Sequence, residues 1–218
     1  MCIRDSPDAI SKLATTGKVA CVYWSGLWVD IGYPVDLLEA SRLLLSRLGG
    51  VKMSSKAVVE DNVVLKPPVY IDEGAYIDHY TVIKGPVYIG RESFIGAHSF
   101  IRHYSSLEDH VRIGAYTEIK NSILQPYTLV DSHCFIGDSI IGENTSIGDH
   151  VVTLNILPEN QKPPRLRQHL VQSIKGRQPL KLGSIIGYNT IVGAGTILYP
   201  GTTIKPNTRI NPGSKITT

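Results

Sequence analysis

Apolar residues recur with a period of six along most of the chain. From Val59 to Ile119 an aliphatic residue stands at every sixth position, eleven times in succession. The pattern continues less regularly from Leu124 to Ile147 and resumes from Ile186 to Ile216. A helix repeats every 3.6 residues and a strand every two, so this period indicates short strands separated by tight corners.

The residue two places before each of these aliphatics is small or β-branched, as Ser93 is before Ile95. Each rung of six would therefore point one large and one small side chain inward, which fills a narrow prism. Glycine often follows the aliphatic directly, as at Gly90 and Gly114. We expect it there because a corner favours positive φ or close backbone approach. With three sides to a turn, the repeat predicts a mainly β protein, a parallel β-solenoid of about seven coils.

The first 50 residues show no such repeat and predict a short α/β segment. We expect a short helix over 7–17, a strand over 22–31 and an amphipathic helix over 34–48, which Pro34 begins and Gly49 ends. The apolar stripe of that second helix consists of Leu37, Leu44, Leu45 and Leu48. The chain is thus divided into an N-terminal piece, 1–50, and a β-solenoid, 51–218.

The residue just before each inward aliphatic faces outward, and in the early coils it is apolar. This holds in eight successive rungs from Val58 to Phe100, after which Ser106 is polar. A tube surrounded by water has no need of such a surface. We expect these coils to be covered by the 34–48 helix, by a further domain or by other subunits, so that Tyr70, Tyr88 and Phe94 are not largely exposed.

Composition excludes several classes of function. The 218 residues carry 22 Lys and Arg against 19 Asp and Glu, a net charge of +3 that gives no electrostatic case for binding nucleic acid or a membrane surface. No apolar run is long enough to span a bilayer. Cys2, Cys21 and Cys134 are too few and too scattered for a disulfide framework, which favours the cytoplasm.

Two stretches resemble known families. Residues 89–94, Ile-Gly-Arg-Glu-Ser-Phe, resemble the hexads of hexapeptide-repeat transferases, whose fold is a left-handed parallel β-helix, and the likeness extends over about 58–216. Residues 26–34, with Trp28, Asp30 and Gly32, resemble the last segment of the catalytic domain of sugar-1-phosphate nucleotidylyltransferases. Together they are similar to the bifunctional sugar-1-phosphate uridylyltransferase/glucosamine-1-phosphate acetyltransferases, including the archaeal type.

The N-terminal resemblance implies that Asp30 binds the Mg²⁺ used in nucleotidyl transfer, because a hard cation held by carboxylates neutralises the phosphates. The alternative is a structural Asp where a strand meets a turn. The family's Gly-rich start and partner Asp are missing, so nucleotidyl transfer is not expected from this chain alone. Residues 1–6 have no counterpart in the resemblance, and we expect a C-terminal fragment of a nucleotidylyltransferase with an unrelated leader.

The β-helix resemblance implies acetyl transfer from acetyl-CoA to an amino-sugar phosphate, at a site between the subunits of a homotrimer. Arg102 and Lys120 match residues that hold the sugar phosphate, and Asn155 matches one that orients the acceptor. Arg102 and Lys120 are eighteen residues apart, one coil, so we expect them to stack on one side. The family's basic His falls on Ser132, and the neighbouring His133 is the candidate catalytic base.

Several departures keep other interpretations open. Phe135, Ser146 and Ile156 replace a Tyr, an Asn and a Tyr of the family pattern. A one-residue offset points His133 the wrong way along a strand unless a bulge corrects it, so His133 is alternatively a structural or exposed histidine, with His150 as a possible substitute base. Arg102 and Lys120 are alternatively solvated cations. The whole β-helix is alternatively a non-catalytic oligomerisation or regulatory module.

A long interruption of the repeat, residues 154–182, carries six Lys or Arg against one acidic residue. Connections of this length in a compact fold are usually functional. We expect the segment either to contact a phosphate-bearing ligand, CoA or a sugar phosphate, or to form a basic loop on a neighbouring subunit. It has no interleaved aromatic residues of the kind that bind RNA.

Overall fold

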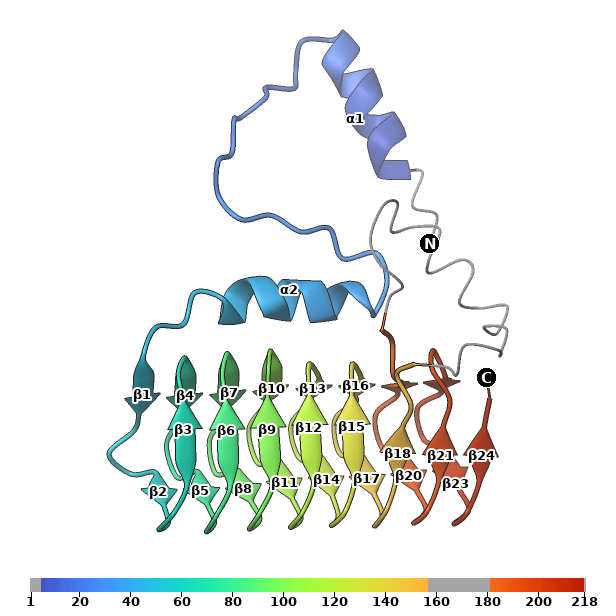
Figure 1. The fold of residues 1–218 in the computed structure, drawn as a ribbon. Helices are drawn as coiled ribbons and strands as arrows, with labels where there is room; N and C mark the ends of the chain where they lie inside the picture. Colours follow the sequence, from blue (N-terminus) through green and yellow to red (C-terminus); the bar gives the residue numbers. More distant parts are fainter. Residues whose placement is uncertain (1–4, 157–180, 218) are drawn as a thin grey trace.

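The computed structural model describes residues 5–156 and 181–217 and shows a three-sided tube (Figure 1). Its 24 strands contain two or three residues each and form three eight-stranded sheets of parallel strands. The predicted fold, a left-handed parallel β-helix, is confirmed, whereas the predicted α/β segment before it contains helices only. The tube has eight turns rather than about seven.

The three sheets, called A, B and C, each take every third strand of the chain. Sheet A contains β1 (Val51–Met53), β4 (Val69–Ile71), β7 (Val87–Ile89), β10 (Ser105–Leu107), β13 (Ile123–Leu124), β16 (Ile140–Ile141), β19 (Ile185–Ile186) and β22 (Thr203–Ile204). Sheet B contains β2 (Val58–Val59), β5 (Tyr76–Ile77), β8 (Phe94–Ile95), β11 (Arg112–Ile113), β14 (Leu129–Val130), β17 (Ser146–Ile147), β20 (Ile191–Val192) and β23 (Arg209–Ile210). Sheet C contains β3 (Val64–Lys66), β6 (Val82–Lys84), β9 (Phe100–Arg102), β12 (Glu118–Lys120), β15 (Phe135–Gly137), β18 (Val152–Thr153), β21 (Ile197–Leu198) and β24 (Lys215–Ile216).

Two strands lie outside the hydrophobic repeat, and they account for the extra coil. Strand β1 precedes the first aliphatic of the repeat and pairs with β4. Strand β18 has Thr153 at its inward position, where it is fully buried. The Thr153 hydroxyl accepts a hydrogen bond from the Gly137 N–H at 2.9 Å, so a buried polar residue is satisfied at this inward position. Because Thr153 is polar, the period of apolar residues does not reveal this rung.

The interior of the tube is one continuous column of aliphatic side chains. Ile71, Ile101 and Ile119 are among many that are fully buried, and they stack in register along their sheets. The small inward residues are buried beside them, and many of those with a hydroxyl group hydrogen-bond to the next coil, as when the Thr117 hydroxyl donates to the Asp131 carbonyl at 3.0 Å. The predicted pairing of one large and one small inward residue is confirmed.

The corners differ from the expectation for glycine. The glycine after each aliphatic has ordinary φ, and its role is close approach: a Cβ on Gly114 would lie 2.5 Å from the Ser132 backbone nitrogen of the next coil. The left-handed position comes two residues later and is taken mostly by non-glycine residues, among them Asn62, His98 and His133. Asn and His tolerate this conformation better than most residues, which explains their recurrence at the corners.

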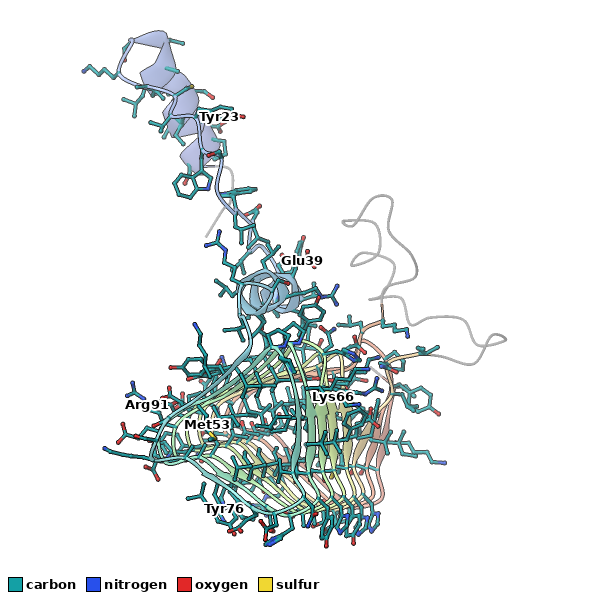
Figure 2. All side chains as sticks on the ribbon, turned by 60° about the vertical axis from the view of Figure 1, so that its left-hand side comes forward. Tyr23, Glu39, Met53, Lys66, Tyr76 and Arg91 are labelled. Atoms are coloured by element: carbon teal, nitrogen blue, oxygen red, sulfur yellow. The ribbon has the colours of Figure 1, made fainter. Side chains whose placement is uncertain are left out.

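Two helices precede the tube, α1 (Asp5–Thr15) and α2 (Asp36–Leu45), close to the two predicted helices. The strand predicted over 22–31 is wrong. These residues have no regular structure, and Val22 and Tyr23 are 87% and 94% exposed, because in the described structure the segment lies away from the tube and pairs with no strand (Figure 2).

Helix α2 lies across the coils on the outer face of sheet A, where it appears end-on above the tube in Figure 2. Val35 and Leu38 pack against Ile123, Ile140 and Leu182. Leu45 is also buried, but Leu44, predicted on the same apolar stripe, is 69% exposed because the helix touches the tube along a narrower line.

The outward apolar residues are covered unevenly. Tyr70, Tyr88 and Phe94 are each half-buried, as expected. On sheet B, away from α2, Tyr76 stacks on Phe94 with ring centroids 5.7 Å apart. Neither described helix is long and apolar enough to cross a membrane.

The packing of the tube predicts a position-dependent loss of stability. Replacing the fully buried Ile119 by Ala should lower the free energy of unfolding by about 2–5 kcal/mol, because it opens a cavity between stacked coils. The outward Ile191, 40% exposed, is the matched control, and its replacement by Ala should cost less than about 1 kcal/mol. Denaturant unfolding followed by circular dichroism measures both; equal losses would contradict the assigned inward and outward faces.

Candidate functional site

A row of cations runs along the edge where sheet C turns into sheet A. Lys66, Lys84, Arg102 and Lys120 are the last residues of β3, β6, β9 and β12 and pair in register from coil to coil. We call them the cationic row. Successive strands of a sheet are about 4.8 Å apart, so the four charges lie close together along one outer edge of the tube. The predicted stacking of Arg102 and Lys120 is confirmed.

Two carboxylates accompany the row. Arg102 donates from Nε to Glu118 Oε1 at 2.7 Å, and its Nη2 lies 2.6 Å from the same oxygen. Lys120 Nζ lies 3.4 Å from Asp138 Oδ2. Lys66 and Lys84 are exposed. Because four cations are accompanied by only two carboxylates, this edge carries a net positive charge, which is suited to binding a phosphate.

Asp138 brings together residues from several parts of the chain. It is 4% exposed, and its Oδ1 accepts a hydrogen bond from Asn121 Nδ2 at 2.7 Å. Its Oδ2 accepts from Asn155 Nδ2 at 2.5 Å, on the same oxygen that faces Lys120. The predicted ligands Lys120 and Asn155 therefore share one buried carboxylate.

His103 lies at this edge, directly after Arg102. Burial lowers its pKa below the ordinary value of 6.5, and the charges of Lys84, Arg102 and Lys120 lower it further. The imidazole thus responds to three members of the cationic row. This histidine was not among the predicted site residues.

The candidate base His133 lies at a different corner, between sheets B and C. It has φ of 60° and is exposed, while the next residue, Cys134, is buried. The predicted wrong-way strand orientation does not occur, because His133 is a corner residue and not a strand residue. His133 belongs to a stack of five rings, one from each of five successive coils, which we call the ring ladder: Tyr80, His98, Tyr116, His133 and His150.

Within the ring ladder His133 lies between Tyr116 and His150, with ring centroids 5.2 and 5.0 Å away and ring planes nearly parallel. Both faces of its imidazole are therefore covered, and its edge with the nitrogen atoms is left to meet other groups. His150, the substitute base, lies directly beside it.

Strand β15 separates His133 from the cationic row. His133 precedes this strand, whereas Gly137 at its end pairs with Lys120. Four residues of extended chain span about 13 Å, so one chain does not bring the predicted base next to the predicted phosphate ligands.

Ser132, the position of the family's basic His, lines a surface pocket of about 440 Å³ on sheet B. Arg112, Asp131 and Asp149 also line this pocket, and Asp149 accepts a hydrogen bond from the Ser132 N–H at 3.1 Å. Burial raises the pKa of Asp131, and the Asp149 charge adds to the effect. Ser132 therefore shares a pocket with two carboxylates and Arg112, and with no member of the cationic row.

The predicted metal ligand Asp30 is exposed in the irregular segment between the two helices. Across residues 5–156 and 181–217, no group of three or more His, Cys, Asp or Glu side chains is arranged to hold a metal ion. Asp30 by itself does not fit a Mg²⁺ site, which needs several oxygen ligands in octahedral geometry.

Most of the basic segment predicted to contact a phosphate-bearing ligand, residues 157–180, lies outside the described residues. Its ends are described: Asn155 before it bonds to Asp138, and the Gly183 N–H after it donates to the Asp138 carbonyl at 2.8 Å. Lys181 is exposed. Both ends of the segment are thus tied to the same corner residue.

Sequence reasoning missed Asp138 and Asn121, although a signal for them exists. Asn121, Asp138 and Asn155 follow one another at intervals of seventeen, the coil length in this part of the chain, since Ile119 pairs with Ile136. A coil of seventeen rather than eighteen residues in this part of the chain predicts that Asn121, Asp138 and Asn155 stack at one corner.

A tube of hexapeptide rungs defines the chain as a hexapeptide-repeat protein. The family model described as "GMPPB C-terminal domain" matches residues 83–178. A "Bifunctional protein GlmU" of Methanocaldococcus jannaschii is 40% identical over 188 residues, which cover 85% of this chain and 44% of that protein. A "Bifunctional sugar-1-phosphate nucleotidylyltransferase/acetyltransferase" of Sulfurisphaera tokodaii is 34% identical, over 83% and 44% of the two chains.

Over most of its length the chain is similar to these bifunctional sugar-1-phosphate nucleotidylyltransferase/acetyltransferases, as the resemblance predicts. It spans less than half the length of the curated relatives it matches. Among solved structures it is similar to the acetyltransferase domain of PglB from Neisseria gonorrhoeae in complex with acetyl coenzyme A, at 13% identity and a TM-score of 0.36 over 97% of this chain and 93% of that one. A likeness of that size carries no argument about activity.

The electrostatics of the cationic row predict a shift at His103. Replacing the exposed Lys84 by Ala should raise the pKa of His103 towards 6.5, because one of the charges that disfavour imidazolium is removed. NMR titration of the histidine ring protons measures the shift. Lys205→Ala, in an exposed position on the last full coil, is the control and should leave His103 unchanged. An unshifted His103 in the Lys84 variant would show that the row does not act on it.

Proposed function

We propose that the β-helix transfers an acetyl group from acetyl-CoA to the amine of an amino-sugar phosphate, a step of nucleotide-sugar biosynthesis. The observation that carries this proposal is the edge formed by the cationic row, where Arg102 and Lys120 stack in register and Asn155 reaches the same carboxylate as Lys120. The name of the relatives, bifunctional nucleotidylyltransferase/acetyltransferases, supports it.

In this proposal the cationic row binds the phosphate. Lys66 and Lys84 are open to solvent, whereas Arg102 and Lys120 already have carboxylate partners. A phosphate therefore meets two open ammonium groups and competes with Glu118 for the Arg102 guanidinium. Asn155, held next to Lys120, orients the sugar that carries the phosphate.

The chemical step needs a base at the acceptor amine. The amine nitrogen attacks the thioester carbonyl of acetyl-CoA, a C–N bond forms, and the C–S bond breaks. His133 takes the proton that the amine loses and returns it to the departing sulfur, so the products are the N-acetylated sugar phosphate and free CoA thiol. The exposed nitrogen edge of His133 is the group suited to this transfer.

Because β15 separates His133 from Lys120, a complete site requires a second copy of the chain. The corner with His133 from one copy and the edge with the cationic row from another would then face a common groove, and a homotrimer supplies three such grooves. The proposed co-substrate acetyl-CoA and the free thiols of Cys21 and Cys134 fit a cytoplasmic protein. Nucleotidyl transfer with Mg²⁺ is proposed only for the longer proteins of the family.

A second candidate is a non-catalytic oligomerisation or regulatory module of a nucleotidylyltransferase. Ser132 at the family's His position and the covered faces of His133 favour it. In that case the cationic row would be a contact surface for another domain or subunit.

One assay separates the two functions. The purified chain, mixed with acetyl-CoA and glucosamine-1-phosphate, should release free thiol, and His133→Ala should lower kcat by about a hundredfold through loss of the base. His98→Ala, which removes another ring of the same ladder between Tyr80 and Tyr116, is the control and should retain the rate. Absence of turnover together with absence of CoA binding would leave the module as the function.

A further inference from the structure

The buried carboxylate of Asp138 has a role that the predicted site residues do not include. We propose that Asp138 is a positioning residue for the sugar-phosphate site, and that Asn121 and Arg42 connect it to helix α2. This inference rests on the proposed function, because it concerns the same ligands, Lys120 and Asn155.

Every polar group of Asp138 has a partner. Its carboxylate accepts hydrogen bonds from Asn121 and Asn155 and lies 3.4 Å from the Lys120 ammonium. Its N–H donates to the Lys120 carbonyl at 2.9 Å, and its carbonyl accepts from the Gly183 N–H. One residue with a left-handed backbone, φ of 51°, therefore fixes the side chain of Lys120, that of Asn155 and the chain on both sides of the 157–180 segment.

Fixing these side chains in advance strengthens ligand binding. A lysine side chain loses several rotatable bonds when it binds a ligand, and that entropic cost is smaller if the side chain is already held in place. Without the carboxylate, Lys120 is free to move and the Asn155 amide loses its acceptor. Asp138 need not touch the substrate to act in this way.

Asn121 extends the network to α2. It is 6% exposed, and while its Nδ2 donates to Asp138, its Oδ1 accepts a hydrogen bond from Arg42 Nη2 at 3.2 Å. The two contacts together decide which way the amide points. If Arg42 were lost, the Asn121 amide would keep its hydrogen bond to Asp138 but lose the second contact that fixes its position.

Arg42 is itself held in place. Its guanidinium carbon lies 5.2 Å from the centre of the Tyr104 ring and Nη1 lies 4.0 Å from Glu39 on the same helix. Helix α2 is the part of the N-terminal piece that packs on the tube, so a change in its position on sheet A would reach Lys120 and Asn155 through Arg42, Asn121 and Asp138. The site is thereby connected to α2 and to the segment that precedes it.

The first test uses Asp138→Asn in the full chain. It removes the charge but keeps the shape, so we expect the Kd for glucosamine-1-phosphate, measured by calorimetry, and its KM to rise about tenfold. We expect kcat in the thiol-release assay to change by less than about threefold, because the reacting atoms are elsewhere. Asp109→Asn is the matched control, since Asp109 Oδ1 also accepts a hydrogen bond at a corner of the tube, in its case from the Arg91 backbone N–H at 2.9 Å.

The second test uses Arg42, which is exposed enough to be replaced without disturbing the tube. Arg42→Ala should raise the Kd about threefold, Arg42→Lys should restore part of the loss, and Arg47→Ala, in an exposed position just after α2, should have no effect. The Arg42→Ala/Asp138→Asn double variant should bind no more weakly than Asp138→Asn alone, because both changes act on one network.

The outcomes distinguish the two proposals. A wild-type chain that binds no glucosamine-1-phosphate refutes the proposed function and this inference with it. A wild-type chain that binds, with variants of Asp138 and Arg42 that bind equally well or lose affinity additively, refutes the inference alone. If Asp138→Asn does not fold by circular dichroism, the Arg42 variants decide: an unchanged Kd in Arg42→Ala refutes the connection, and a loss that Arg42→Lys partly restores supports it.

Discussion

The packing of side chains inside a narrow three-sided tube is the constraint on which the rest of the structure depends. Each rung has room for one large and one small inward residue, and the fully buried Ile101 and Ile119 occupy successive positions of one sheet. Because each coil must lie in register with the next, any residue at a given place in the rung lies beside its equivalents one coil away. The hydrophobic core thereby decides which polar residues meet on the surface.

This constraint produces both surface features of functional interest. Cations at the ends of successive strands of sheet C become the cationic row, and aromatic residues at one corner become the ring ladder. Neither depends on a turn or loop of unusual shape. Residues about eighteen positions apart in the sequence become neighbours on successive coils of the tube. A solenoid can therefore build a repeated surface from a simple sequence repeat.

The same geometry limits what one chain can do. The candidate base His133 and the proposed phosphate ligands are at opposite ends of sheet C strands, and no rearrangement within a rigid tube would bring them together. A second copy of the chain resolves that separation in the proposed mechanism. The helix α2 adds a further connection, since it is packed on sheet A and hydrogen-bonded to Asn121 at the edge of the proposed site.

The sequence by itself determined the tube, its inward residues and the stacking of Arg102 on Lys120, because all three follow from a repeat that is local and periodic. Other features depended on tertiary structure. The pattern did not show the rung of Thr153, because a buried hydroxyl there replaces an aliphatic, and it predicted a strand over 22–31 that has nothing to pair with. Asp138 joins Lys120, Asn121 and Asn155 only because the coil shortens to seventeen residues at that point. Contacts between residues far apart in the chain depend on the summed lengths of all the rungs between them, and only the folded tube fixes that sum.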